Sequence, residues 1–271
     1  MAVEDIAEIP ERLVPGTLAW DLYQVEHKQR YEWALDYCQG KRVLDVACGT
    51  AYGSTILAQS GAAHVVGVDI SVDAIPSNGN RPARLALANG DACSLPFDDD
   101  SFEVVVSFET IEHLTSPEHL LREISRVLKS GGVCICSSPN RDFFPSSGRK
   151  ETNPFHLSEM SYEEFDDLFA KYFEVSERFS QTHSEMYIRH LQLLRELDER
   201  LKPIRFSRLL RIENKIRRLL RRDPLHGVEG LSARLSRAVA GDYVIKPLRE
   251  VSSDLLTFIL VGKSKGTLST T

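Results

Sequence analysis

The chain has 271 residues, 42% hydrophobic and 27% charged, with a formal net charge of −6. This balance is typical of a globular protein with one sizeable core and appendages, and it excludes a fibrous or intrinsically disordered chain. We find neither a secretory signal pattern nor an apolar run near the roughly 18 residues of a membrane span, so we expect a cytoplasmic protein.

An arm and a helix are predicted ahead of the first strand. Residues 1–15 contain two prolines and show no clear period. Aromatic and apolar residues recur among charged ones over 20–38, which predicts one long helix. We expect residues 1–39 to form an arm and a helix that covers a cofactor.

Residues 43–53 organise the rest of the chain. An apolar strand is predicted over 42–46, followed by a turn of small residues that includes Ala47, Gly49 and Ala51, and then by a helix. Small residues after a buried parallel strand let the backbone approach a ligand, and the helix N-terminus points at it. The run predicts a nucleotide-type cofactor, with tight strand-to-helix packing as the alternative.

Three further strands are predicted in this half. The strand over 63–70 ends near Asp69, which is placed to accept hydrogen bonds from ribose hydroxyls or to cap the next helix. A short helix over 71–80, weakened by Pro76, leads to a third strand at 84–88. The fourth strand, 102–108, is almost wholly apolar and is therefore expected to be buried on both faces.

The order of these motifs resembles the class I S-adenosylmethionine-dependent methyltransferases over residues 40–180. Asp45 and Gly49 match motif I, Asp69 the ribose acid, and Gly90-Asp91-Ala92 the adenine loop. Ala47 and Ala51 depart from the motif, which usually has glycine at both places. The resemblance implies an α/β fold with a Rossmann-like seven-stranded methyltransferase sheet, helices on both faces, and a helical basic insert before the last strand.

The resemblance also implies S-adenosyl-L-methionine as the cofactor. The residues expected to contact it are Arg30, Asp45, Ala47, Gly49, Tyr52, Asp69, Ile70, Asp91, Ala92 and Phe108. Arg30 lies in a segment that resembles the pre-motif region of ubiquinone-pathway O-methyltransferases, where an arginine meets the cofactor's carboxylate. A guanidinium fits that group bidentately. The alternatives are a solvated helical face for Arg30 and an ordinary turn aspartate for Asp91.

Glu109, Glu112 and His113 follow the fourth strand. If a helical turn begins there, positions i, i+3 and i+4 share one face. His156 lies in the loop after the fifth strand, which in this fold returns over the same end of the sheet. The pattern resembles ubiquinone-pathway O-methyltransferases and plant-type small-RNA 2′-O-methyltransferases, in which these four side chains hold a divalent cation beside the accepting hydroxyl.

Two carboxylates and two imidazoles suit Mg²⁺, Mn²⁺, Co²⁺ or Zn²⁺. A hydroxyl bound to such an ion loses its proton more readily and can attack the sulfonium methyl group. The expected catalytic residues are His113, His156 and Glu109, and the expected metal ligands are Glu109, Glu112, His113 and His156. In the alternative no metal is bound, and His113 is a general base or only packs.

The second half of the chain completes the sheet around an insert. We predict a helix over 116–128, a fifth strand at 133–137, a loop over 138–158 that serves as a substrate lid, a helix over 160–172, a sixth strand at 173–179 and a last strand at 255–262. The domains are then 1–39, the cofactor-binding core 40–180, the insert 181–250, and 251–271 with the last strand.

Residues 181–240 hold 14 Lys or Arg against 7 Asp or Glu. Within them, apolar residues recur at helical spacing over 204–222, with basic residues between them. Such a helix can contact anionic lipid or bound phosphate, or dock by its apolar face onto the domain or a second subunit in a homodimer. Contact with anionic lipid would place the protein at the membrane periphery.

The sequence therefore predicts a methyltransferase that acts on a hydroxyl of a small or carrier-linked acceptor, of glycan, lipid or quinone-like type. An RNA 2′-O-methyltransferase is the runner-up. It is favoured by the metal pattern and the basic insert and disfavoured by the acidic remainder, so a nucleic-acid partner is less expected. A non-catalytic cofactor-binding subunit that regulates a partner is the third hypothesis.

Overall fold

The computed structural model describes residues 18–71, 81–142, 155–184, 243–248 and 256–265. They form one eight-stranded sheet with the order β3-β2-β1-β4-β5-β8-β6-β7. The strands are β1 (Arg42–Val46), β2 (His64–Asp69), β3 (Leu85–Asn89), β4 (Phe102–Ser107), β5 (Leu128–Pro139), β6 (Phe173–His183), β7 (Tyr243–Pro247) and β8 (Thr257–Ser264). The predicted Rossmann-like α/β fold is confirmed, and the sheet has eight strands where seven were predicted.

The first five strands run parallel, and β8 runs antiparallel between β5 and β6. The strand order reverses between β1 and β4. In open α/β sheets ligands bind at such a reversal, outside the carboxyl ends of the strands. The turns that follow β1, β2, β3 and β4 all open at this edge, which places the candidate site.

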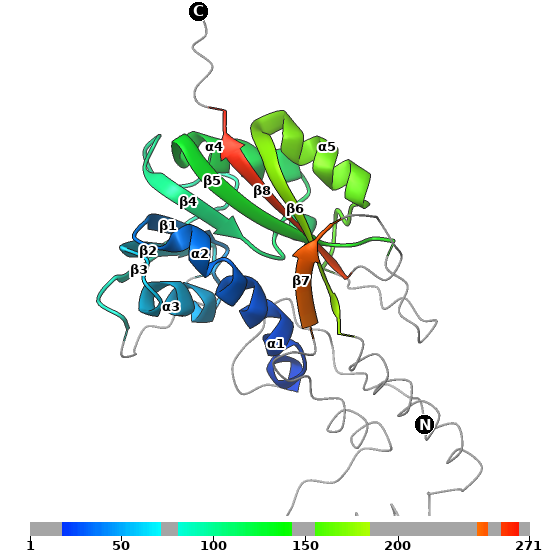
Figure 1. The fold of residues 1–271 in the computed structure, drawn as a ribbon. Coiled ribbons are helices and arrows are strands. Elements are labelled where there is room, and N and C mark those ends of the chain that lie inside the picture. Colours follow the sequence, from blue (N-terminus) through cyan, green and yellow to red (C-terminus); the bar gives the residue numbers. More distant parts are fainter. Residues whose placement is uncertain (1–17, 72–80, 143–154, 185–242, 249–255, 266–271) are drawn as a thin grey trace, which may run out of the picture.

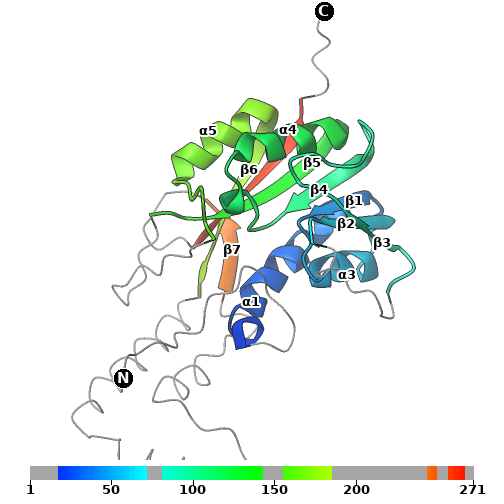
Figure 2. The same ribbon diagram turned by 180° about the vertical axis from the view of Figure 1, so that it is seen from behind.

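Helices cover both faces of the sheet (Figure 1). One face carries α4 (Pro117–Val127) and α5 (Tyr162–Tyr172), and the other carries α1 (Leu18–Trp33), α2 (Leu35–Cys38) and α3 (Tyr52–Gln59). Neighbouring residues of β1 show why the strands are apolar throughout: Val43 packs on the α1–α3 side and Leu44 on the α4–α5 side, and both are fully buried. Figure 2 shows the same two layers from behind.

The extra strand, β7, lies inside the range predicted as a helical insert, 181–250. It pairs antiparallel with the far end of β6, which extends to His183, beyond the predicted end at 179. The β7 backbone is tied to α1, since Gln29 Nε2 donates to the Tyr243 carbonyl at 2.7 Å. The predicted helix over 71–80 and most of the insert, including 204–222, lie outside the described residues.

Most predicted strand and helix boundaries lie within two residues of the observed ones, but β5 begins at Leu128, five residues before its predicted start at 133. The predicted single helix over 20–38 is two helices separated at Ala34. Ser161 begins α5 with a capping box, because its hydroxyl accepts from the Glu164 backbone N–H and the Glu164 carboxylate accepts from the Ser161 N–H. Ser116 precedes α4 without a side-chain cap, and Pro117 starts that helix.

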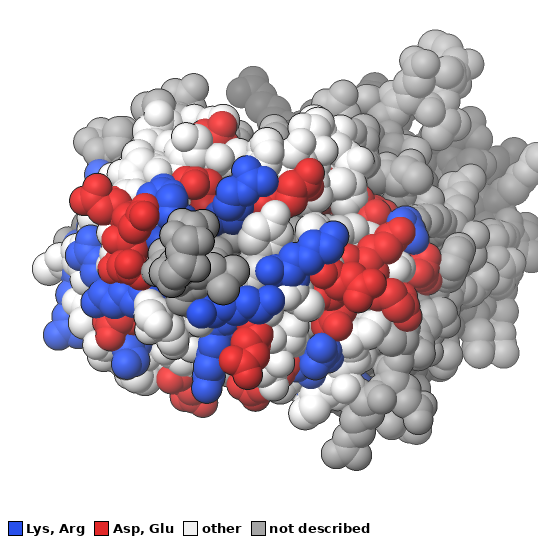
Figure 3. Space-filling view, turned by 90° about the horizontal axis from the view of Figure 1, so that it is seen from above, with Lys and Arg blue, Asp and Glu red and all other residues white. Residues whose placement is uncertain are grey.

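Charge on the described surface is mixed. In Figure 3, Lys and Arg side chains lie interspersed with Asp and Glu over the face that is turned to the viewer. No helix in the described part of the chain combines the length and the hydrophobicity needed to span a bilayer.

Candidate active site

The turn after β1 holds three residues in the left-handed backbone region: Ala47 at φ 58°, Gly49 at φ 53° and Ala51 at φ 59°. Only glycine visits this region without strain, and each alanine costs about 1–2 kcal/mol. A Cβ added at Gly49 would have no atom within 4 Å, so this backbone borders open space. The turn thus keeps a strained backbone conformation beside open space, at a cost in stability.

Asp45 lies beneath this turn and does not line the cavity above it. Its carboxylate is fully buried and accepts hydrogen bonds from the Tyr31 hydroxyl at 3.1 Å and the Ser54 hydroxyl at 2.5 Å. Burial raises its pKa to about 7, against the opposing effect of these hydrogen bonds. Asp45 therefore links α1 and α3 to β1. It would affect cofactor binding indirectly, by holding the turn in its conformation.

Tyr31 fills the space between these elements. Its ring lies 4.9 Å from the Phe108 ring and 5.7 Å from the Tyr52 ring, edge-on to both. A side chain at Gly53 would overlap it, since an added Cβ would fall 2.1 Å from the Tyr31 ring. The rings of Tyr31, Tyr52 and Phe108 thus pack beneath the turn. Tyr52 and Phe108, which were expected to contact the cofactor, do not line the cavity described next.

A cavity of about 200 Å³ runs from this turn to the end of β4. Its lining comprises Ala47, Gly49, Asp69, Ile70, Gly90, Asp91, Ala92, Glu109, Thr110, His113 and Leu114. These residues come from the turns after β1, β2, β3 and β4. One cavity is thus lined by the residues predicted to contact ribose and adenine, Asp69 and Asp91, and by His113.

Asp69 is held in place by backbone donors. Its Oδ2 accepts from the Gly49 N–H and its Oδ1 from the Ser71 N–H, each at 2.9 Å. A carboxylate oxygen can accept more than one hydrogen bond, and Asp69 lines the cavity, so its position is compatible with contacts to ribose hydroxyls. Ile70, next to it, is 64% exposed, and an apolar side chain at that position can pack on a flat base.

Arg30 belongs to the last turn of α1, and its side chain is buried at 1% exposure. Its Nη1 donates to Gln181 Oε1, and its Nη2 lies 3.9 Å from Glu109 Oε2. Its Nε and Nη2 atoms have no hydrogen-bond partner among the described residues. Buried donors left unsatisfied cost about 1–3 kcal/mol each, so this guanidinium fits a carboxylate ligand such as that of S-adenosylmethionine.

Glu109 is directed to Arg30 and Ser137. Its backbone has φ 51°, and its Oε1 accepts from the Ser137 hydroxyl at 2.7 Å. The short 3-10 helix η1 (Ile111–His113) starts only after it. The expected sharing of one helical face by Glu109, Glu112 and His113 is therefore not found, and Glu109 lies outside the cluster described next.

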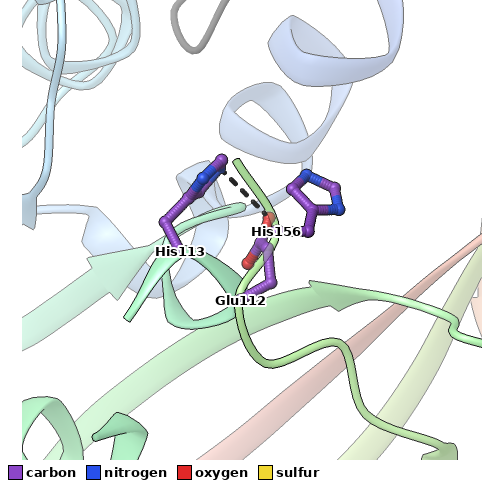
Figure 4. Close-up of side chains that lie close together, drawn as sticks. All are labelled: Glu112, His113 and His156. Carbon is purple, nitrogen blue, oxygen red and sulfur yellow. Dashed lines mark ion pairs between the residues drawn. The ribbon is translucent and has the colours of Figure 1, made fainter. Parts of the chain in front are cut away.

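Glu112, His113 and His156 form a compact cluster, with one potential ligand atom from each lying within 4.8 Å of the others. The two imidazole rings are 4.9 Å apart and nearly perpendicular. Figure 4 shows the Glu112 carboxylate below and between them, with its ion pair to His113 Nε2, which measures 3.8 Å. Three of the four predicted metal-binding residues thus converge.

The Glu112 carboxylate is 1% exposed, and neither of its oxygens has a hydrogen-bond partner in the described part of the chain. Burial, and next the nearby Glu109 charge, raise its pKa well above its ordinary value. A carboxylate without donors beside two imidazoles is the environment that a divalent cation relieves. The residues present fit such an ion.

Backbone hydrogen bonds fasten the His156 loop to the η1 turn. The Glu112 carbonyl accepts from the Leu157 N–H at 2.8 Å and the Ser158 N–H at 2.9 Å, and the Ser158 hydroxyl donates to the Ile111 carbonyl at 3.1 Å. His113 Nδ1 lies 3.0 Å from the Phe155 carbonyl. The described end of this loop, residues 155–158, therefore lies over the end of the sheet as expected, whereas residues 143–154 lie outside the described residues.

Sequence reasoning missed the residues that support the site. They are Tyr31, Ser54, Ser137, Glu159 and Gln181. Four of them lie between 9 and 151 residues from their partners along the chain, so no local pattern marks them. Glu159 is the exception, because it follows His156 at the three-residue spacing that brings side chains together on a turn.

Comparison with known proteins identifies the family. A family model described as a methyltransferase domain matches residues 44–136. A Mycolicibacterium smegmatis protein named as a probable S-adenosylmethionine-dependent methyltransferase is 32% identical over 185 residues, which cover 66% of this chain and 72% of that one. Demethylmenaquinone methyltransferase of Clavibacter sepedonicus is 42% identical over 106 residues, or 37% of this chain and 43% of the relative.

The fold agrees with a solved S-adenosylmethionine-dependent methyltransferase of Thermotoga maritima. The two share a TM-score of 0.55 at 17% sequence identity, and the match covers 92% of each chain. The turn of small residues after β1, the acid at the end of β2 and the sequence relatives converge on one conclusion. This chain belongs to the class I S-adenosylmethionine-dependent methyltransferases.

Proposed function

We propose that this methyltransferase acts on a hydroxyl of a small or carrier-linked acceptor of glycan, lipid or quinone-like type. One observation carries the proposal: the Glu112–His113–His156 cluster adjoins the end of the cavity that begins at the Gly49 turn. The name of the demethylmenaquinone methyltransferase relative supports a quinone-like acceptor. S-adenosylmethionine supplies the electrophilic methyl group when bound.

The residues of the cluster have distinct tasks in this proposal. With its Nδ1 proton donated to the Phe155 carbonyl, neutral His113 has its basic lone pair on Nε2, the nitrogen that would accept a proton from an acceptor hydroxyl. The Glu112 carboxylate, 3.8 Å from that nitrogen, stabilises the resulting imidazolium. Removing the proton makes the oxygen a better nucleophile toward the methyl group.

Divalent-metal assistance is the finer part of the proposal. Glu112, His113 and His156 would hold the ion, which would act as a Lewis acid toward the acceptor oxygen. Two imidazoles favour Mn²⁺, Co²⁺ or Zn²⁺ over Mg²⁺, which prefers an all-oxygen set. Glu109 is not required as a ligand, because it is engaged by Ser137 and Arg30.

Methyl-transfer assays separate metal assistance from general-base catalysis. Protein dialysed against EDTA is assayed with Mg²⁺, Mn²⁺, Co²⁺ or Zn²⁺ added back, and its metal content is measured. If metal assists, the chelator abolishes transfer, and Glu112→Ala and His156→Ala each lower kcat by orders of magnitude while S-adenosylhomocysteine still binds. Full activity in EDTA, with only His113→Ala severe, leaves His113 as a general base.

The acceptor is identified by offering the enzyme and labelled S-adenosylmethionine to quinone, lipid, sugar and RNA fractions of a cell extract. Label in a hydroxyl-bearing quinone, lipid or sugar supports the proposal. Label in RNA alone identifies the 2′-O-methyltransferase instead. Binding of S-adenosylhomocysteine without transfer to any fraction, together with a stable protein partner, favours the regulatory subunit.

We further propose that the basic stretch 204–222, which lies outside the described residues, contacts an anionic group on the acceptor or its membrane. The support is its sequence pattern alone. Replacing Arg217, Arg218, Arg221 and Arg222 with Gln should weaken binding to anionic vesicles and reduce its salt dependence, with cofactor affinity unchanged. A change in oligomeric state alone would mean that the stretch is a homodimer contact.

A further inference from the structure

Glu159 lies three residues after His156, with its Oε1 at 2.5 Å from His156 Nδ1. The two side chains are 22% and 16% exposed, so the contact is shielded from bulk water. We propose that Glu159 is a positioning residue that holds the His156 ring with its Nε2 lone pair turned to Glu112 and His113. This inference rests on the proposed function in giving His156 a role in the site.

The hydrogen-bonding capacity of the two groups determines the tautomer. An ionised carboxylate only accepts hydrogen bonds, so the His156 nitrogen that contacts it must carry the proton. The other nitrogen of a neutral ring then keeps its lone pair. In Figure 4 one His156 nitrogen lies on the side of His113 and the other points away from the cluster. The carboxylate thus prepares the inward nitrogen to accept.

His113 has the same arrangement on the opposite side of Glu112. Its Nδ1 lies 3.0 Å from the Phe155 carbonyl, which also only accepts, and its Nε2 is 3.8 Å from Glu112 Oε1. Two rings from different segments are therefore both anchored through Nδ1. Imidazoles that bind a metal, or that accept a proton, need such a second contact to fix orientation and basicity.

A purely structural role for Glu159 is the competing explanation. The loop is already fastened without it, by the Leu157 and Ser158 backbone bonds to the Glu112 carbonyl and by the Ser158 hydroxyl. Those bonds place the His156 backbone but leave the rotation of its ring open. The ring itself is contacted edge-on by His113 and at Nδ1 by Glu159. Of these two contacts only the one from Glu159 selects which nitrogen carries the proton, which is why we assign Glu159 to positioning.

The tautomer is measured directly by long-range proton–nitrogen NMR of the imidazole rings at a pH where they are neutral. The chain has eight histidines, and His156→Gln assigns the signals of His156. We expect His156 to be protonated at Nδ1 in the parent protein, to shift toward Nε2 protonation in Glu159→Ala, and to return to Nδ1 in Glu159→Gln, whose amide oxygen can accept. Glu174→Ala, at an exposed position of β6, is the matched control and should change nothing.

Binding of Co²⁺ alone, followed by visible absorption, is the second measurement. Loss of such a supporting contact typically weakens metal affinity about 10–100-fold, so we expect that loss in Glu159→Ala, a smaller one in Glu159→Gln and none in Glu174→Ala. A parent protein that binds no Co²⁺ contradicts metal assistance, and the tautomer then decides the role of Glu159 by itself. A His156 ring protonated at Nε2 in the parent, or unchanged in Glu159→Ala, overturns the inference.

Discussion

Replacing Glu112 with methionine should stabilise the metal-free protein while abolishing methyl transfer. The carboxylate is 1% exposed, lacks hydrogen-bond donors among the described residues, and lies near Glu109, whose charge disfavours its own. Leaving a buried polar group unsatisfied costs about 1–3 kcal/mol, and an apolar side chain of similar length removes that cost. At about 2–4 °C per kcal/mol for a chain of this size, Tm should rise by roughly 2–12 °C.

Thermal unfolding in EDTA, followed by circular dichroism, measures the shift, and Glu174→Met is the control for adding a methionine at an exposed site. Adding Co²⁺ or Zn²⁺ should make the parent protein more stable than Glu112→Met. A bound ion at about 1,000 times its Kd stabilises the parent protein by about 4.1 kcal/mol, which exceeds the gain from the substitution, and leaves Glu112→Met unaffected. A variant less stable than the parent in EDTA would refute the reasoning, because Glu112 would then have a favourable partner in the metal-free fold.

Three further predictions follow from the described geometry. The pKa of Asp45 is about 7 in the folded protein, against an ordinary value of 3.8. Protonated Asp45 therefore favours the folded state, and the free energy of unfolding falls as pH rises from about 4 through 7. Asp45→Asn should remove this pH dependence, which amounts to a change on the order of 4 kcal/mol in the free energy of unfolding. Urea unfolding measured from pH 4.5 to 8 tests this, and an unchanged pH slope in the variant contradicts it. Asp69→Ala should cost about 2–4 kcal/mol of S-adenosylhomocysteine binding by calorimetry, since two charge-assisted ribose contacts are lost; unaltered affinity would place the ribose elsewhere. Ser161→Ala should lower the free energy of unfolding by about 1 kcal/mol through loss of the α5 cap, whereas the uncapped position Ser116 should tolerate alanine with little change.

The sequence by itself determined the family and most of the sheet. The strand predicted at 42–46 matches β1 residue for residue, and the acid expected at the end of the second strand is the last residue of β2. Such signals are local: an apolar run, a turn of small residues and a polar residue at a strand end are read within a few positions. Their order along the chain then specified the fold.

Tertiary structure alone decided which side chains meet. Glu109 is the clearest case: its spacing from Glu112 suggested a shared face, but a left-handed backbone and a hydroxyl 28 residues away turn it toward Arg30. Gln181 reaches Arg30 across 151 residues. The antiparallel pairing of β7 with β6 likewise depends on contacts that no periodicity encodes. Backbone conformation at one residue and packing between distant segments, which a linear pattern does not contain, select the members of the site.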